Sequence, residues 1–119
     1  MAKGQRTHPD RIRWLLALPW AYPASALKEL DQADDTGAVG IMVPAKIAGR
    51  HLVEAAFAPI WKAIDDKGLA VLVHPANPPG TDEKPLAGHS LTATVGFTFD
   101  TTLAITRRVF SGFPDRHPT

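Results

Sequence analysis

The chain has 119 residues, which is enough for one small domain with a modest core. Its 13 lysine and arginine residues nearly balance 12 aspartate and glutamate residues, and neither sign forms a long run, so no nucleic-acid or anionic-membrane partner is expected. The absence of cysteine excludes disulfides and thiolate metal sites. Since no apolar run approaches membrane-spanning length, we expect a cytoplasmic protein with a small-molecule or protein partner.

Short apolar runs that end at a proline alternate with helical patterns in the first part of the chain. Residues 12–18 form the first strand candidate, and a proline closes it. We expect a helix over residues 23–34, because Pro23 suits a first helical turn and Gly37 follows as a stop. Residues 39–43 are the second strand candidate, and a proline again ends the run.

A second helix is expected over residues 58–67, after a polar loop that contains Gly49 and His51. Pro59 lies in its first turn, where proline is favoured. Its apolar residues recur with the spacing of one helical face that packs on a core. We therefore expect Trp61 to be a core residue. The residues of this face are Phe57, Ile60, Trp61 and Ile64.

The strand candidate that organises the chain is residues 70–75, Ala-Val-Leu-Val-His-Pro. A continuous apolar run after Gly68 is typical of a buried parallel strand, and Pro75 ends it because proline cannot donate a ladder hydrogen bond. His74 then lies at the carboxyl end of the strand, where α/β barrels keep catalytic groups and metal ligands. Position alone leaves two interpretations open: a functional histidine, or a histidine whose hydrogen bonds are satisfied at a strand end.

The order strand, helix, strand, helix, strand implies a parallel sheet with right-handed crossovers. Residues 76–88 contain three prolines and are expected to form a long loop on the His74 side. A last helix is expected from about Leu91, with Asp100 as its N-terminal cap. The residues spaced for one face of this helix are Phe99, Leu103, Thr106 and Phe110.

A complete (β/α)₈ barrel needs about 250 residues, or about 30 for each unit of one strand and one helix. We therefore expect an α/β fold that is a partial (β/α)₈ barrel of the TIM type with about three to four units. Residues 1–119 would then be an internal part of a single barrel domain. Three parallel strands with helices on one face would leave open edges and an uncovered apolar face, so self-association is expected.

Four blocks of the sequence, in order and at suitable spacing, resemble the amidohydrolase-related family. The branch that they resemble is typified by aminocarboxymuconate-semialdehyde decarboxylase and γ-resorcylate decarboxylase. The resemblance covers the chain from about Pro9 to its end. The blocks are residues 56–61 (Ala-Phe-Ala-Pro-Ile-Trp), 68–75 (Gly-Leu-Ala-Val-Leu-Val-His-Pro), 95–105 (Val-Gly-Phe-Thr-Phe-Asp-Thr-Thr-Leu-Ala-Ile) and 110–118 (Phe-Ser-Gly-Phe-Pro-Asp-Arg-His-Pro).

The resemblance implies a distorted barrel that holds one divalent metal, commonly zinc or manganese. In that family the metal ligands are a His-x-His or Glu-x-His pair on the first strand, a histidine that ends a middle strand, and a late aspartate. A further histidine, in a His-Gly-Gly motif, serves acid/base chemistry. Only the middle-strand histidine has a match, His74, because the first-strand pair would precede Met1 and the His-Gly-Gly block would follow Thr119. One ligand does not hold a catalytic metal, which needs about three protein ligands.

Other residues are weaker candidates for the site. His8 and His117, each in a His-Pro pair, are expected to be solvated turn residues. No catalytic residue is assigned within the chain. The candidates for a substrate pocket are His51, His89, Phe97 and Phe99.

The function that the resemblance implies is part of a metal-dependent carboxy-lyase that acts on a small carboxylated substrate. A hydrolase of the same superfamily is an alternative. The competing hypothesis is a catalytically inactive chain, either a truncated product or an interaction fragment that needs a second chain to close the barrel.

Overall fold

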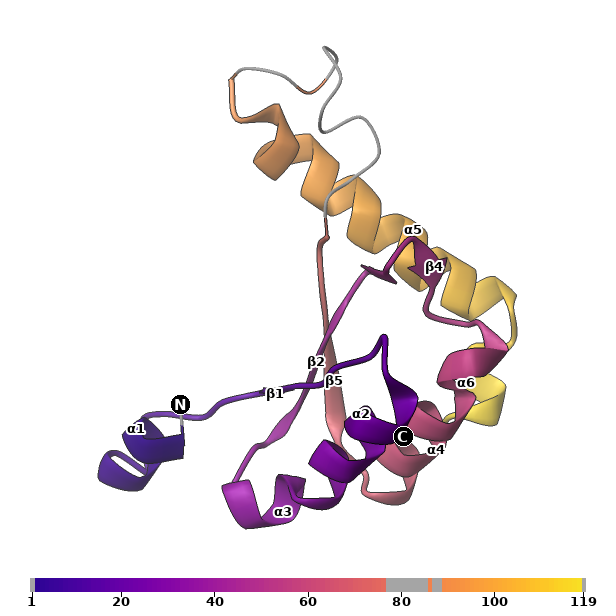
Figure 1. Ribbon diagram of the computed structural model, residues 1–119. Coiled ribbons are helices and arrows are strands. Elements are labelled where there is room, and N and C mark those ends of the chain that lie inside the picture. Colours follow the sequence, from indigo (N-terminus) through magenta and orange to yellow (C-terminus); the bar gives the residue numbers. More distant parts are fainter. Residues whose placement is uncertain (1, 77–85, 87–88, 119) are drawn as a thin grey trace.

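The computed structural model describes residues 2–76, 86 and 89–118. At its centre lies a parallel sheet of three strands in the order β1-β2-β5 (Figure 1). Helical segments connect the strands, so the predicted alternation of strands and helices is confirmed. The strands are β1 (Leu16–Ala17), β2 (Gly40–Pro44) and β5 (Ala70–His74).

The two faces of the sheet have different surroundings. Ile41 of β2 pairs with Val71 of β5, and their side chains point to the same side because they are register partners. Ile41 and Val43 are fully buried on this side, which we call the packed face. Met42 and Leu72 pair on the other side, where half of the Leu72 side chain is exposed. We call this second side the open face.

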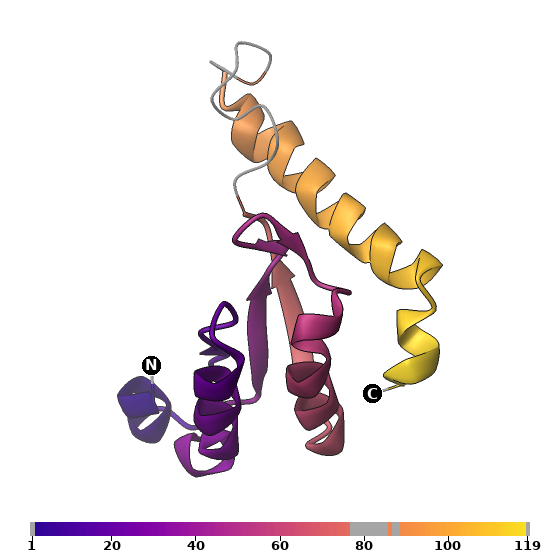
Figure 2. The same cartoon turned by 45° about the vertical axis from the view of Figure 1, so that its right-hand side comes forward.

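Helices α2 (Pro23–Asp31) and α4 (Ala58–Asp66) lie side by side over the packed face (Figure 2). Each helix has a proline in its first turn, where the missing N–H costs no intrahelical hydrogen bond. Trp61 is a core residue, as predicted, and its Nε1 donates a hydrogen bond to the Leu52 carbonyl at 2.7 Å. The residues that the two helices bury are Ala26, Leu30, Ile60, Trp61 and Ile64.

The last helical segment crosses the carboxyl ends of the strands and then returns to the packed side. Helix α5 (Phe97–Phe110) makes this crossing, and α6 (Phe113–Arg116) packs against α4 (Figure 1). Within the described residues, no helix has the length and apolar character needed to cross a membrane. The remaining elements are α1 (Ala2–Thr7), α3 (Ala33–Thr36), β3 (Lys46–Ile47), β4 (Arg50–His51), η1 (Ala55–Phe57), η3 (Thr92–Gly96), α5 (Phe97–Phe110) and α6 (Phe113–Arg116).

Two predicted bounds are wrong near the N-terminus. The first strand covers only Leu16–Ala17 instead of residues 12–18, because β2 begins at Gly40 and the ladder pairs only these two residues with it. The helix predicted over residues 23–34 ends at Asp31, and the short helix α3 follows before Gly37.

The loop predicted around Gly49 and His51 contains a small antiparallel pair, β3 and β4. Its two turn residues, Ala48 and Gly49, both have positive φ angles, of 49° and 77°. Positive φ at both central positions is the geometry of a type I′ turn, which suits a two-residue hairpin. The turn could not be predicted from the sequence, because Ala48 occupies a position where glycine or asparagine is the usual residue.

Two predicted burial patterns are also wrong. Strand β5 is not buried on both faces: it forms one end of the sheet, and Leu72 and His74 on the open face are exposed. Helix α5 does not bury the face with Phe99 and Phe110, whose exposed fractions are 54% and 85%. Its buried residues are Asp100 and Ala104, because that side faces the ends of β2 and β5. The predicted loop 76–88 lies almost entirely outside the described residues.

Candidate functional site

His74 lies at the carboxyl end of β5, as predicted, and its side chain is exposed. Its register partner is Pro44, the last residue of β2, so the two strands end together. The His74 Nδ1 atom lies 2.8 Å from the Pro75 carbonyl oxygen. A carbonyl oxygen only accepts hydrogen bonds, so Nδ1 carries the proton in this contact. The lone pair of Nε2 is then available to a metal ion.

Main-chain contacts fix the position of this histidine on the strand. The His74 carbonyl accepts a hydrogen bond of 2.7 Å from the Ala45 N–H, which extends the ladder past the end of β2. On the other side, the Ala76 N–H donates to the Asp100 Oδ2 at 2.8 Å. The backbone on both sides of His74 is therefore held by partners from two other elements.

Asp100 is a charged residue near His74 that the sequence analysis did not include among the candidate site residues. It is not an N-terminal cap: η3 runs directly into α5, and the Asp100 carboxylate accepts from the Ala76 N–H. Only 5% of Asp100 is exposed, and its Oδ1 lies 3.7 Å from the Lys46 Nζ. The sequence carries no local signal for this pair, because Lys46 and Asp100 come from segments that lie far apart in the chain.

His51 lies on β4 beside the end of α5 and contacts a cation there. Its Nε2 is within hydrogen-bond distance of the Arg107 guanidinium, which can only donate. The His51 N–H donates to the Glu54 Oε1 at 2.7 Å, and the Arg50 Nε donates to the other carboxylate oxygen at 2.9 Å. These two hydrogen bonds, that of Arg50 first, hold the pKa of Glu54 below its ordinary value.

The three remaining predicted pocket residues lie in the last helical segment or just before it. His89 is exposed and has a positive φ of 48°. Phe97 is half-buried, and Phe99 projects largely into solvent. In the part of the chain that the structure describes, no hydrogen bond or ring contact joins any of these three residues, or His51, to His74. Their role in a pocket stays a prediction.

A divalent metal needs more ligands than the described residues bring together. Among residues 2–76, 86 and 89–118, no group of three histidine or carboxylate side chains is placed to hold a metal ion. His74 can supply one such ligand, because an imidazole whose Nδ1 donates a hydrogen bond to a carbonyl carries a lone pair on Nε2. The described residues thus supply one candidate metal ligand and not a complete metal site.

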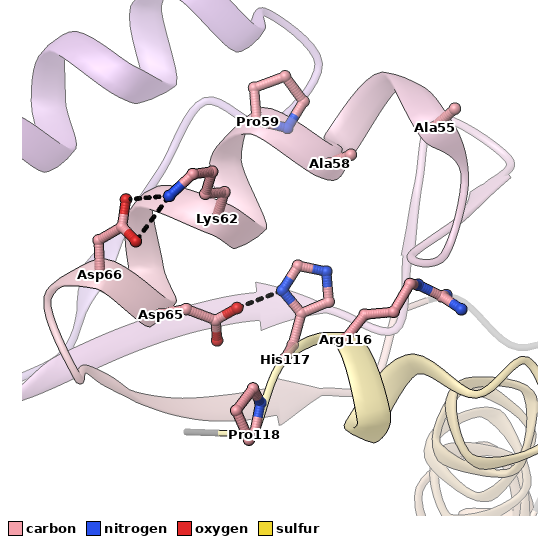
Figure 3. A pocket seen from close by; sticks show the side chains of 9 residues that line it. All are labelled: Ala55, Ala58, Pro59, Lys62, Asp65, Asp66, Arg116, His117 and Pro118. Atoms are coloured by element: carbon pink, nitrogen blue, oxygen red, sulfur yellow. Dashed lines mark hydrogen bonds and ion pairs between the residues drawn. The ribbon is translucent and has the colours of Figure 1, made fainter.

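A concave region lies between α4 and α6, away from His74 (Figure 3). Its volume is about 790 Å³, and charged residues line it. Lys62 pairs with Asp66 at 2.8 Å, and His117 pairs with Asp65. His117 is therefore not the solvated turn residue that was predicted: it is half-buried and stacks on Phe113 at 4.3 Å. Since the side chains of Asp65 and Asp66 are engaged with neighbouring side chains, we assign no catalytic role to this cavity.

The comparison with known proteins shows what the chain as a whole is similar to. No protein-family model matches the chain. A 2-amino-3-carboxymuconate-6-semialdehyde decarboxylase of Dictyostelium discoideum is 30% identical over 112 residues, which is 93% of this chain and 31% of that protein. The crystal structure of a 5-carboxyvanillate decarboxylase from Sphingomonas paucimobilis superposes with a TM-score of 0.87 at 26% identity, over 99% of this chain and 36% of that one. Over nearly its whole length, the chain is thus similar to decarboxylases of the family that the four sequence blocks resemble.

A third similar protein has a solved structure that contains a bound metal ion. It is a dihydroxybenzoic acid decarboxylase from a Polaromonas species, with bound manganese and the inhibitor 2-nitroresorcinol. It matches 98% of this chain and 38% of its own chain, at 26% identity and a TM-score of 0.82. The chain thus spans about a third of the curated relative and somewhat more of the solved family members. The predicted partial barrel fold is confirmed by these matches and by the parallel sheet.

Proposed function

We propose that this chain forms part of a cytoplasmic, metal-dependent carboxy-lyase that acts on a small carboxylated substrate. The observation that carries the proposal is His74, which lies at the carboxyl end of β5 with its Nδ1 hydrogen-bonded to the Pro75 carbonyl. The similarity to decarboxylases over nearly the whole chain supports the choice of reaction. Decarboxylation is preferred to hydrolysis because these relatives are named decarboxylases.

In this proposal His74 supplies one ligand to a zinc or manganese ion. Such an ion, when bound, supplies positive charge for a substrate carboxylate. The open face next to His74 carries Met42 and Leu72, which would form an apolar wall beside the ring or chain of the substrate. His51, His89, Phe97 and Phe99 are the proposed contributors to the remaining wall. The other metal ligands and the acid/base group would come from outside the described residues.

A second candidate is a chain with no activity by itself. It is favoured by one observation, that the described residues bring together no group able to hold a metal. The two candidates make the same prediction for the isolated chain and differ for a chain that is joined to the rest of a barrel.

The experiment is a chimaera in which this chain replaces the aligned third of the Dictyostelium decarboxylase. We expect the chimaera to release carbon dioxide from the substrate named for that enzyme, and a chelator to abolish this turnover. The isolated chain, assayed with added zinc or manganese, should show no turnover. A folded chimaera without chelator-sensitive turnover would contradict the proposed function. Robust turnover by the isolated chain would show that the ligands are misplaced.

A further inference from the structure

The peptide group between Pro75 and Ala76 contacts a side chain at each of its ends. Its carbonyl oxygen accepts a hydrogen bond from the His74 Nδ1 at 2.8 Å, and its N–H donates to the Asp100 Oδ2 at 2.8 Å. A peptide group is planar and rigid, so holding its N–H also fixes the direction of its carbonyl. Asp100 and the His74 ring are therefore connected through one rigid unit.

Asp100 is suited to hold this unit firmly. It is 5% exposed, and a buried carboxylate is retained only with partners for its charge. One oxygen accepts from the Ala76 N–H, and the other lies 3.7 Å from the Lys46 Nζ. Hydrogen bonds to an ionised carboxylate are about twice as strong as those between neutral groups. The carboxylate thus joins the end of β5 and the segment after β2 to helix α5.

The charge of Asp100 also acts on the carbonyl. An anion next to the N–H polarises the peptide group and makes its oxygen a better acceptor. A better acceptor favours the proton on the His74 Nδ1 over the proton on Nε2. The neutral ring then keeps its Nε2 lone pair free, which is the form that binds a metal ion.

We infer that Asp100 is a positioning residue that acts on His74 through the Pro75–Ala76 peptide group and holds the imidazole in its Nδ1–H tautomer. The metal-binding consequence rests on the proposed function, whereas the tautomer itself does not. The chain of contacts runs from Lys46 to Asp100, to the peptide group and to the His74 ring.

The test uses the isolated chain and reads the ring nitrogens of His74 by ¹⁵N NMR at alkaline pH, where the imidazole is neutral. In the parent we expect a single Nδ1–H tautomer and a slowly exchanging Ala76 amide. In Asp100→Ala we expect a substantial Nε2–H population, with Ala76 exchange faster by about tenfold or more. Asp100→Leu removes the same acceptor without leaving a cavity, so it decides the question if the alanine variant does not fold.

The matched control is Asp65→Asn, which removes a half-buried carboxylate from its pair with His117 on the far side of α4. This variant should leave the His74 tautomer and Ala76 exchange unchanged. A parent chain whose His74 is in the Nε2–H form would overturn the inference, as would folded Asp100 variants that keep the parent spectrum.

The outcome is separable from that of the proposed function. If Asp100→Leu shifts the tautomer but the chimaera has no metal-dependent turnover, Asp100 positions a histidine that has another role. If the chimaera is active and loses its metal in His74→Ala, while the Asp100 variants keep the parent tautomer, the positioning role of Asp100 is wrong and the function stands.

Discussion

Glu54 shows how a single exposed side chain orders the segment that carries His51. Its carboxylate accepts hydrogen bonds from the Arg50 Nε and the His51 N–H, and these hold the pKa of Glu54 below its ordinary value. A carboxyl group whose pKa is lower in the folded chain stabilises the fold above its unfolded pKa. That contribution of Glu54 to the β3–β4 segment disappears as the pH falls through the lowered pKa.

The first prediction concerns this pair of residues. Arg50→Ala should raise the pKa of Glu54 toward its ordinary value, because the hydrogen bond from Arg50 is the largest cause of the shift. A carboxyl-carbon NMR titration of Glu54 measures this pKa. Lys62→Ala, which removes a similar pair with Asp66 on α4, is the control and should leave Glu54 unchanged. An unchanged midpoint in Arg50→Ala would show that Arg50 does not hold the carboxylate in solution.

Helix α6 joins the last part of the chain to the core, and the buried Phe113 ring takes part in that contact. Phe113 is 3% exposed and meets the Trp61 ring edge to face at 5.0 Å. The Arg108 guanidinium lies over the Phe113 ring at 4.1 Å, and burial lowers the pKa of Arg108. On the other side, His117 stacks against the same ring. The position of α6, and with it the end of α5, depends on this ring.

The second prediction compares two phenylalanines that lie three residues apart. Phe113→Ala should lower the free energy of unfolding by about 3–5 kcal/mol, because it removes a buried ring and leaves a cavity. Phe110→Ala is the matched control, and it should change that energy by less than about 0.5 kcal/mol, since Phe110 is 85% exposed. Urea unfolding measures both. Equal losses in the two variants would mean that α6 does not pack on Trp61.

The order of the elements could be predicted from the sequence because proline and glycine mark their ends. Pro23, Pro59 and Gly68 lie at the helix ends where their backbone geometry is favoured. The side of α5 that packs could not be predicted in the same way. Its apolar residues are spread around the helix, and a buried aspartate decides which side faces the strands. A hydrogen bond to the main chain of a residue 24 positions away leaves no periodic pattern.

Of the two residues of the candidate site, His74 could be predicted from the sequence and the role of Asp100 could not. His74 could be found because it ends an apolar strand next to a proline. Asp100 could not be assigned its role, since an aspartate in a first helical turn is usually explained as a cap. Only the crossing of α5 over the strand ends brings its carboxylate to Ala76. Pairing between distant segments is therefore the information that local patterns lack.

On the scale of the whole molecule, the open face of the sheet is the feature with the largest consequence. In the described part of the chain, helices cover one face, while Leu72 and His74 on the other face are exposed. Among the residues that the structure describes, strands β1 and β5 form the two ends of the sheet, and each pairs with β2. Uncovered apolar surface and unpaired strand edges favour association with another chain.

The third prediction is that the isolated chain self-associates at micromolar concentration. Leu72→Lys should weaken this association, because it places a charge in the centre of the open face. Tyr22→Lys is the control, since Tyr22 is 70% exposed and lies before α2, on the other side of the fold. Sedimentation velocity measures the size of the species. A sharp monomer with a cooperative thermal transition would contradict this expectation.

The central claim is that His74 is a metal ligand, and metal content tests it most directly. The measurement is the amount of zinc and manganese bound to the chimaera with the Dictyostelium decarboxylase and to its His74→Ala, His51→Ala and His89→Ala variants. We expect about one ion per parent chain, and most of it should be lost only in His74→Ala. The fold should survive, because His74 is exposed at a strand end and packs little of the core. Equal metal content in His74→Ala and in the parent would contradict the assignment.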